Sequence, residues 1–582
     1  MCGIAGIVGN YPAFQLDAML DSQHHRGPDA TGKYFDDGCV ALGHNRLAII
    51  DLTEQSNQPF IDNSGRYVIV FNGEIYNYIE LKTDLQNLYD FKTQSDTEVL
   101  LAAYIVYGSN CLQKCNGMFA FAIWDNREKK LFAARDRFGV KPFYYTIQEY
   151  SFYFSSEIKA LHAAGISKLP NEKVWSSYFA YGSYGLPDET FWEGIVQLPG
   201  GYFLEYQNKT LITKKWYCFE DEVAKQPQNL TFEQAKEHYI LLLKDSIKLR
   251  FRADVPVGFN ISGGLDSSVL LAMVNFETKS KDENDSKNLQ SINAYTFYCN
   301  HPDYDELHWV EKMIAKTNNP LTKVLLQANE VPHLAQKMAW QQDEPYGGIP
   351  TLAYSKIFQQ ARKDKVLVLL DGQGMDEQWA GYDYYTQLNE ATIQGVSDSP
   401  YKKAMLSESF LSKVKKPVYP TPFEDTVLNK QYRDLFYTKI PRALRFNDRI
   451  SMSYSTELRE PFLDYRLVEF AFSLPLDFKI RNGQTKYMLR EIASEYLSND
   501  LVFAPKRPLQ TPQREWLAED LKDWLSECFT KVEHSIFSHW FDREELKREL
   551  QLYFNGNRQS SFHIWQLISW YEILGKAPEN QS

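Results

Sequence analysis

The sequence places a cysteine directly after its first methionine. Because cysteine is small, Met1 should be removable, and its removal leaves Cys2 with a free α-amino group. Such an amine has a reference pKa of about 7.7–8.0, so it can accept the thiol proton near neutral pH, directly or through a water. Nucleophile and base then lie on one residue, and the thiolate can attack an amide carbonyl and release ammonia. The alternative is a cysteine with no catalytic role, so further motifs must decide.

The tripeptide Asn72-Gly73-Glu74 could supply the donors that such an attack requires. It follows the apolar stretch Tyr67–Phe71, which predicts a strand. An asparagine amide and a glycine N–H are suitable donors to the oxyanion that develops on the attacked carbonyl. Asn-Gly alone is more often only a turn, so this assignment also depends on the neighbouring motifs.

A phosphate-binding loop is predicted between a strand and a helix later in the chain. The strand is Val255–Ile261 and the helix is Val269–Phe276. The loop, residues 262–268, reads SGGLDSS. Its glycines allow a tight turn, and its serines and the helix N-terminus offer donors to an anion. The Gly-Lys-Ser/Thr ending of a Walker A loop is absent, so the loop is of another type.

Carboxylates that could serve a metal ion occur in two loops. Asp266 belongs to the phosphate loop, and its hard oxygens suit Mg²⁺. A second loop with carboxylates follows the predicted strand Val366–Leu370 and reads Asp371-Gly372-Gln373-Gly374-Met375-Asp376-Glu377. Its glycines allow close backbone approach at the carboxyl end of a strand, where α/β sheets bind ligands.

The elements that must position these residues divide the chain into two parts. A chain of 582 residues is too long for one hydrophobic core. To about residue 215, short β-prone stretches outnumber helical ones, which predicts a mixed α+β sandwich. From about residue 230, helical stretches such as Phe232–Leu249 alternate with buried strands, which predicts an α/β parallel sheet with helices on both faces. The polar segment Phe219–Leu230 is predicted to be a linker, and the polar run Thr278–Gln290 a surface loop.

Composition and charge exclude several classes of protein. A net charge of −12 gives no electrostatic reason to bind a phosphate backbone or anionic lipid. The seven scattered cysteines complete no zinc site and favour free thiols in a reducing compartment. We find no signal peptide and no apolar stretch of membrane-spanning length. We therefore expect a cytoplasmic protein with no nucleic-acid or membrane partner.

Cys2 and Asn72 belong to an ordered series of motifs. These are Met1–Gly6, His25–Asp29, Gly43–Ile49, Asn72–Asn77 and Ser95–Glu98, continued by Gly117–Asp125, Arg135–Arg137, Gly139–Pro142 and Phe154–Leu161. The series resembles the class II glutamine amidotransferase domain, which is an α+β N-terminal nucleophile sandwich, over residues 1–215. The resemblance implies that Cys2, Asn72 and Gly73 are catalytic and that Arg46 clamps the glutamine α-carboxylate. It also implies that Asp96 and the Glu74 region hold the α-amino group, and that the glutamine site includes Leu47, Ile49 and Ile50.

The motifs of the second part form a second series. The SGGLDSS loop resembles the PP-loop of ATP pyrophosphatases, which cleave ATP between its α- and β-phosphates. The later motifs Arg445–Arg449, Glu457–Asp464 and Lys486–Arg490 complete a pattern similar to that of the asparagine synthetase B-type, glutamine-hydrolysing family, from Met1 to Ile573. The resemblance implies an adenine-nucleotide α-hydrolase-like fold over residues 230–575, with Mg²⁺ on Asp266 and Asp376. It implies that the ATP-binding residues are Asn260, Ser262, Gly263, Gly264, Leu265, Asp266, Ser267, Ser268, Phe297, Asp371, Gly372 and Lys486.

Lys486 has two interpretations. It could neutralise charge on departing pyrophosphate, or it could be a solvated helix lysine. Asn260 and Phe297 likewise either flank the adenine or form plain sheet core.

The two series together imply glutamine-dependent amide synthesis with ATP and Mg²⁺ as cofactors. The part that contains Cys2 would make ammonia and pass it through a protected interior to an acyl-adenylate made by the part that contains Ser262. The substrates are then glutamine, ATP and a carboxylate acceptor, with aspartate as the default, giving asparagine, glutamate, AMP and pyrophosphate. A homodimer is left open.

Gln373 departs from the family pattern, which carries an acidic residue between the two glycines. A neutral amide cannot act as a base or hold an ammonium by charge. The alternative acceptor is therefore another carboxylate, such as a sugar uronate in surface polysaccharide biosynthesis. A cyclase and a non-enzymatic scaffold are further alternatives. Retention of Cys2 and Arg46 counts against the cyclase, and intact Cys2, Asp266 and Asp376 count against the scaffold.

Overall fold

The computed structural model describes residues 1–36, 38–279, 292–386, 400–504, 511–558 and 560–575. The polar run Thr278–Gln290, predicted to be a surface loop, lies outside these residues from position 280 on, and its first two residues end helix α9. No helix among the described residues combines the length and the apolar character needed to cross a bilayer.

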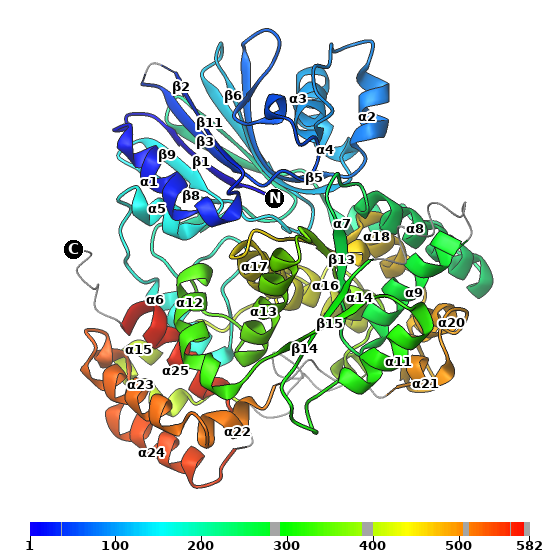
Figure 1. Ribbon diagram of the computed structural model, residues 1–582. Helices are drawn as coiled ribbons and strands as arrows, with labels where there is room; N and C mark the ends of the chain where they lie inside the picture. The colour runs from blue at the N-terminus through cyan, green and yellow to red at the C-terminus, as the bar shows by residue number, and fades with distance from the viewer. Residues whose placement is uncertain (37, 280–291, 387–399, 505–510, 559, 576–582) are drawn as a thin grey trace.

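The N-terminal part is a sandwich of two six-stranded sheets, as the sequence predicts (Figure 1). Every strand pairing in it is antiparallel. The first sheet has the order β10 (Val196–Gln197), β8 (Tyr144–Gln148), β9 (Ser151–Ser155), β1 (Gly3–Val8), β3 (Val40–Arg46), β2 (Ala30–Asp36). The second has the order β12 (Thr210–Lys215), β11 (Tyr202–Gln207), β7 (Lys130–Arg135), β6 (Gly117–Asp125), β5 (Tyr67–Ile75), β4 (Phe60–Ile61).

Alternation along the central strands explains why helices cover both outer faces of the sandwich. In β1, Ile4 and Val8 enter the core between the sheets, whereas Ala5 and Ile7 face the other side. That side is covered by α1 (Phe14–Ser22) and α5 (Ile158–Ala163), and the outer face of the second sheet by α2 (Tyr78–Leu85) and α3 (Asp96–Tyr107). The central strands of both sheets are therefore buried on both faces, which fits their apolar sequences, whereas the edge strands β2 and β12 are partly exposed.

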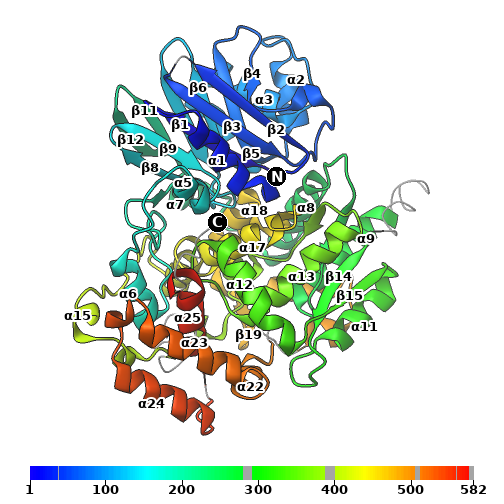
Figure 2. The ribbon, with the colours of Figure 1, turned by 60° about the vertical axis from the view of Figure 1, so that its left-hand side comes forward.

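The C-terminal part contains the predicted parallel sheet. Its strand order is β15 (Leu321–Leu325), β14 (Ala294–Tyr298), β13 (Val257–Asn260), β16 (Val368–Leu370), β17 (Glu457–Arg459), and every pairing is parallel. One face packs against α8 (Phe232–Arg250), α9 (Leu265–Lys279) and α11 (Leu307–Thr317), and the other against α12 (Val331–Gln342) and α13 (Ile349–Lys363). Figure 2 shows this sheet beneath the sandwich. The phosphate-loop helix α9 begins at Leu265, four residues before the predicted start, so Asp266 lies in its first turn.

The predicted linker Phe219–Leu230 contains a short helix, α7 (Phe219–Ala224). Its two apolar residues four positions apart, Phe219 and Val223, are buried on one side of that helix. The Phe219 ring lies 4.9 Å from that of Phe472 in α18 (Tyr465–Ser473), centroid to centroid. The segment is therefore packed against the C-terminal part and is not a free connection.

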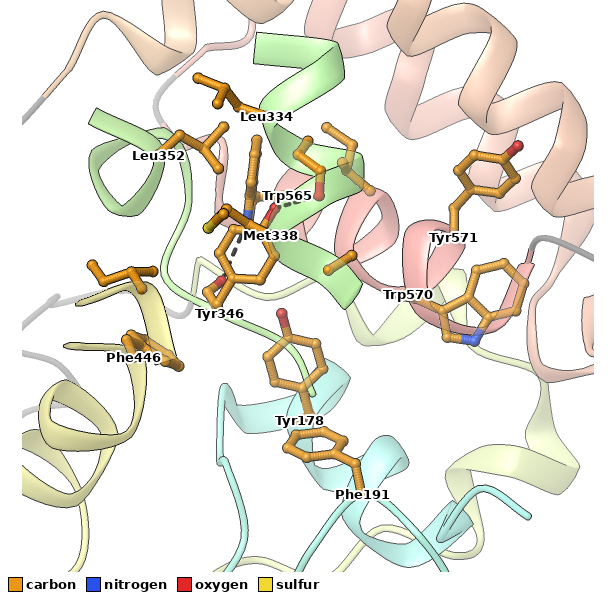
Figure 3. Close-up of a cluster of buried hydrophobic side chains, with 14 of the residues drawn as sticks. Tyr178, Phe191, Leu334, Met338, Tyr346, Leu352, Phe446, Trp565, Trp570 and Tyr571 are labelled. Atoms are coloured by element: carbon orange, nitrogen blue, oxygen red, sulfur yellow. Dashed lines mark hydrogen bonds between the residues drawn. The ribbon is translucent and has the colours of Figure 1, made fainter. Parts of the chain in front are cut away.

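A helix of the N-terminal half of the chain packs among the last helices. This helix is α6 (Glu172–Tyr181). Figure 3 shows its Tyr178 in the same buried cluster as Trp565 of α25 (Phe562–Trp570) and Phe446 of α17 (Lys439–Met452). The Gln566 amide donates to the Tyr178 carbonyl. Around this cluster lie α22 (Gln513–Ala518), α23 (Lys522–His534) and α24 (Arg543–Phe554).

Candidate active sites

Cys2 lies just before β1, where the sandwich meets the C-terminal part (Figure 1). Its backbone N–H donates to Asn72 Oδ1 at 3.0 Å, and its Sγ lies 3.9 Å from the Leu47 carbonyl oxygen. Burial raises the pKa of the Cys2 thiol, and the nearby terminal ammonium opposes that rise. While Met1 is present, burial outweighs this opposing charge and the protonated thiol is the favoured form.

Met1 occupies a buried position next to Cys2. Its ammonium is ion-paired with Glu457 Oε2 at 3.0 Å, and both groups are fully buried. Its side chain shares one buried cluster with Leu47, Ile49 and Ile50, the three residues predicted to belong to the glutamine site. Removal of Met1 would free the Cys2 amine within 3.0 Å of Asn72 Oδ1 and vacate the space beside those residues.

Asn72, predicted with Gly73 to form an oxyanion hole, lies beside Cys2. Asn72 Oδ1 is engaged by Cys2, whereas its buried Nδ2 has no hydrogen-bond partner among the described residues. A buried donor without a partner is costly, so a ligand atom that accepts from it would be strongly favoured. Gly73 has φ +153°, and a Cβ there would lie 2.1 Å from the Met118 carbonyl oxygen. Only glycine fits this position.

Arg46 presents a guanidinium held by backbone and amide oxygens. Its Nη1 donates to the Thr53 carbonyl at 2.7 Å and to Asn57 Oδ1 at 2.8 Å, and its Nη2 donates to the Asp51 carbonyl. No carboxylate in the described part of the chain forms an ion pair with it. Its charge is therefore fixed in place, and its role as a clamp for the glutamine α-carboxylate stays a prediction.

An acidic cluster lies beside Cys2 and combines residues of both parts. Its carboxylates are Glu74, Asp96 and Glu457, with Arg459 as the principal side-chain cation. Burial raises the pKa of Asp96 to about 6, although its Oδ2 accepts from the Ile75 N–H at 2.9 Å. Burial and Glu457 raise the pKa of Glu74 well above its usual range. The cluster suits an additional cation, as predicted for the glutamine α-amino group, but sequence reasoning assigned no role to Glu457 and Arg459.

The phosphate loop borders a cavity of about 710 Å³. This cavity collects residues from both predicted loops. The residues predicted to bind ATP or magnesium that line it are Asn260, Ser262, Gly263, Gly264, Leu265, Asp266, Ser267, Phe297, Asp371, Gly372, Asp376 and Lys486. Ser268 is not among the lining residues and is buried in α9. Ser267 Oγ donates to the Ser262 carbonyl at 2.6 Å, which fixes the turn of the loop.

Asp266, Asp376 and Lys486 meet inside this cavity. Lys486 Nζ lies 2.6 Å from Asp266 Oδ1 and 2.8 Å from Asp376 Oδ1. Burial lowers the pKa of Lys486, but the two carboxylates outweigh this and hold it above its usual value. Lys486 is only 6 % exposed, so it is not a solvated lysine. A Cβ at Gly381 would lie 2.0 Å from Asp376 Oδ1, so glycine is required here.

The arrangement fits a magnesium ion. Two carboxylates from different loops converge on one cationic group, and Mg²⁺ is commonly bound by one or two carboxylates plus substrate phosphates. No cluster of three or more potential metal-ligating side chains occurs within the described residues. The remaining ligands would thus come from phosphate oxygens and water.

Asp371 is held by a tyrosine that sequence reasoning missed. Tyr354 Oη donates to Asp371 Oδ2 at 2.7 Å and accepts from Asn260. Burial raises the pKa of Asp371 to about 6 despite this hydrogen bond. Tyr354 lies in α13 with no motif around it, so no local signal could have found it.

Comparison with known proteins decides the family. Residues 1–217 match the model described as "Glutamine amidotransferase domain", and residues 239–574 match the one described as "Asparagine synthase". Asparagine synthetase [glutamine-hydrolyzing] 3 of Bacillus subtilis is 31% identical, over 100% of this chain and 96% of its own length. Asparagine synthetase [glutamine-hydrolyzing] 1 of the same organism is 26% identical, over 98% and 97%. The chain belongs to the asparagine synthase family.

The family assignment makes the chain an enzyme of glutamine-dependent amidation, with an amidotransferase part and a synthetase part. A relative with another name, Amidase chry2 of Gibberella zeae, is 28% identical over 90% of this chain and 89% of its own length. The matched ranges lie close to the predicted domains, 1–215 and 230–575, whose ends stay predictions.

The two parts are joined by buried ion pairs next to Cys2. Arg26 donates through Nε to the Cys2 carbonyl at 3.0 Å and through Nη1 to Glu157 at 2.8 Å. It also forms two hydrogen bonds with Asp448 of α17, at 2.9 and 3.1 Å. The motifs His25–Asp29 and Arg445–Arg449 are thus in contact. Sequence reasoning assigned no role to Arg26 or to Asp448.

Proposed function

We propose that the enzyme hydrolyses glutamine at Cys2 and transfers the nitrogen to a carboxylate that ATP has activated as an acyl-adenylate. Aspartate is the first candidate acceptor, and the products would be asparagine, glutamate, AMP and pyrophosphate. The observation that carries the proposal is the pairing of Cys2 with Asn72, whose Nδ2 is a buried donor without a partner beside the nucleophile.

The amidotransferase step follows from the groups around Cys2. After loss of Met1, the α-amine takes the thiol proton and Sγ attacks the glutamine side-chain carbon. Asn72 Nδ2 and the Gly73 N–H would stabilise the oxyanion. The proton then passes to the leaving nitrogen, ammonia departs, and water hydrolyses the thioester to glutamate. Arg46 would hold the α-carboxylate while Asp96 and Glu74 hold the α-ammonium.

The synthetase step follows from the cavity at the phosphate loop. The acceptor carboxylate would attack the α-phosphorus of ATP, and pyrophosphate would leave toward Lys486. Asp266 and Asp376 would hold Mg²⁺, which when bound shields the charge of the triphosphate. Ammonia then attacks the acyl carbon and AMP leaves. The cytoplasmic location and a homodimer stay predictions.

A second candidate acceptor is another carboxylate, such as a sugar uronate. The observation that favours it is Gln373, which lines the cavity between Gly372 and Gly374. Its neutral amide cannot hold the ammonium of aspartate by charge.

The test combines enzyme, ATP, Mg²⁺ and glutamine, with and without aspartate. Pyrophosphate and asparagine that appear only with aspartate would support the first acceptor. Pyrophosphate release that ignores aspartate excludes it. Failure to convert glutamine to glutamate would contradict the amidotransferase step.

A further inference from the structure

The phosphate-loop cavity lies where the strand order of the parallel sheet reverses. The chain passes from β13 outward through β14 and β15 and then returns to β16 on the other side of β13. Open α/β sheets bind ligands outside the carboxyl ends of the strands at such a point. Phe259 of β13 is in register with Leu370 of β16, so the residues that follow these strands there are Asn260 and Asp371. Both line the cavity.

The loop that begins at Asp371 lies against the phosphate loop. A Cβ at Gly372 would lie 3.1 Å from the backbone nitrogen of Ser267 and 3.4 Å from the carbonyl carbon of Asp266. Ser267 and Asp266 both belong to the first turn of α9, at which the phosphates of ATP are predicted to bind. Asp371 is therefore one residue away from the backbone that packs against this turn, which places it beside the site where the acyl-adenylate would form.

Asp371 is a buried carboxylate without a cationic partner. It is 7 % exposed, and none of the described basic side chains forms an ion pair with it. Asp266 and Asp376, by contrast, both pair with Lys486 and would hold Mg²⁺. Of these three aspartates, Asp371 alone keeps a charge that no cation among the described residues neutralises.

Neutral donors orient the Asp371 carboxylate. Tyr354 Oη donates to its Oδ2 at 2.7 Å, and the Gly372 N–H donates to its Oδ1 at 2.6 Å. The Gln373 side chain also hydrogen-bonds to it. Burial raises the pKa of Asp371 to about 6, and Asp266 adds to this rise, whereas the three hydrogen bonds lower it. A carboxylate that is oriented but not neutralised suits a base, because a base works best when its pKa lies near the pH of the reaction.

The proposed amidation contains a proton transfer to which no residue has been assigned. Ammonia attacks the acyl carbon with its lone pair, and the new carbon–nitrogen bond gives an adduct whose nitrogen carries an extra proton and a positive charge. The adduct can lose ammonia again until a base takes that proton. Once the proton has gone, the bond between the acyl carbon and the AMP oxygen breaks, its electron pair leaves with AMP, and the amide remains.

We propose that Asp371 is the base that takes this proton from the attacking nitrogen, and that Tyr354 and Gln373 are positioning residues that orient its carboxylate. The inference rests on the proposed amidation and deepens it by assigning the base of its second half-reaction. The proton moves from nitrogen to an Asp371 oxygen and passes to water after the products leave. The family resemblance implies that Asp371 binds ATP, so the experiment must separate the two roles.

The experiment measures the two half-reactions of the full-length enzyme separately, with aspartate and with glucuronate as the acid. Adenylation is followed as acid-dependent exchange of labelled pyrophosphate into ATP without ammonia, and amide formation is followed with ammonium chloride. Asp371→Asn keeps the shape of the side chain but cannot accept the proton. We expect the ratio of amide formation to exchange to fall about 10²- to 10⁴-fold, which is the usual contribution of a general base.

Hydroxylamine as the nitrogen source provides a signature of proton removal. It is a weaker base than ammonia, so its adduct gives up a proton more readily and depends less on the enzyme's base. Asp371→Asn should therefore lose less activity with hydroxylamine than with ammonia. Equal losses with both nitrogen sources would overturn the role of Asp371 as a base.

Two further variants test the position of the carboxylate. Asp371→Asn combined with Gln373→Glu places a carboxylate on the side chain that contacts position 371, and it should recover at least about tenfold of the lost amide formation. Tyr354→Phe removes only the hydroxyl that orients Asp371, and it should lower the ratio of amide formation to exchange by a smaller factor than Asp371→Asn does. A wild-type ratio in Tyr354→Phe would exclude the positioning role.

Asp364→Asn is the matched control. Asp364 also accepts from a tyrosine, Tyr295 at 3.1 Å, but it is exposed and does not line the cavity, so both half-reactions should stay at the wild-type level. A wild-type ratio in Asp371→Asn overturns the inference. So does a loss of exchange as large as the loss of amide formation, which would assign Asp371 to the nucleotide. Wild-type enzyme that exchanges pyrophosphate with neither acid contradicts the proposed synthetase reaction itself.

Discussion

Arg26 and Asp448 are 422 positions apart in the chain and share two hydrogen bonds in the interior, at 2.9 and 3.1 Å. The Arg26 guanidinium also donates to the Cys2 carbonyl. Asp448 of α17 therefore helps to fix the backbone of Cys2 through Arg26. The position of Cys2 therefore depends on the synthetase part.

Asp448→Ala should destabilise the enzyme. The change leaves Arg26 buried with only Glu157 as a charged partner, and loss of one partner of a buried ion pair costs about 3–5 kcal/mol. The midpoint of urea unfolding should fall accordingly. Asp500→Ala, which removes a surface carboxylate paired with Lys312, should leave that midpoint unchanged. An equal midpoint in both variants would contradict the structural role of the pair.

Cys2→Ala should abolish the use of glutamine but retain synthesis from free ammonia. The substitution removes the nucleophile and leaves the phosphate-loop cavity intact, because Cys2 does not line it. The measurement is AMP formation with glutamine and then with ammonium chloride. If ammonia-driven synthesis disappeared as well, the division of labour between the two parts would be wrong.

Asn72→Ala should reduce the kcat of glutamine hydrolysis about 10²- to 10³-fold, which is the usual effect of removing one oxyanion donor. The variant also removes the acceptor of the Cys2 N–H, so a control is needed. Asn72→Asp keeps that acceptor but lacks the Nδ2 donor, and it should be similarly impaired. Wild-type glutaminase activity in Asn72→Asp would exclude the oxyanion role.

The KM for glutamine should rise as the pH falls through about 6. Burial raises the pKa of Asp96 to about 6, so the carboxylate is protonated below that pH and loses its charge. It can then no longer attract the substrate ammonium, and KM should increase about tenfold for each further pH unit. Asp96→Asn should give a high KM that changes little between pH 7 and 5. If the KM of Asp96→Asn rose equally steeply as the pH fell, the titration would belong to another group.

The sequence predicted the fold because its patterns are local. Alternation in β1 and the strand–loop–helix order around residues 262–268 each follow from a few neighbouring residues. What it could not predict are contacts between distant segments. Glu457 beside Met1, Tyr354 beside Asp371 and the ion pair of Arg26 all depend on how the two parts pack. The sequence shows the motifs that contain Glu457 and Asp448. It does not show which residues these two carboxylates contact.

Lys486→Met should impair synthesis and spare glutamine hydrolysis. The methionine keeps much of the side-chain volume but removes the cation that Asp266 and Asp376 share. Because Lys486 would stabilise the charge that develops on departing pyrophosphate, kcat for ammonia-dependent AMP formation should fall by about 10²–10³. Lys312→Met, a change at an exposed lysine on α11, provides the matched control. Equal losses of synthesis and glutaminase activity in Lys486→Met would point to a damaged fold, whereas full synthesis would remove Lys486 from the mechanism.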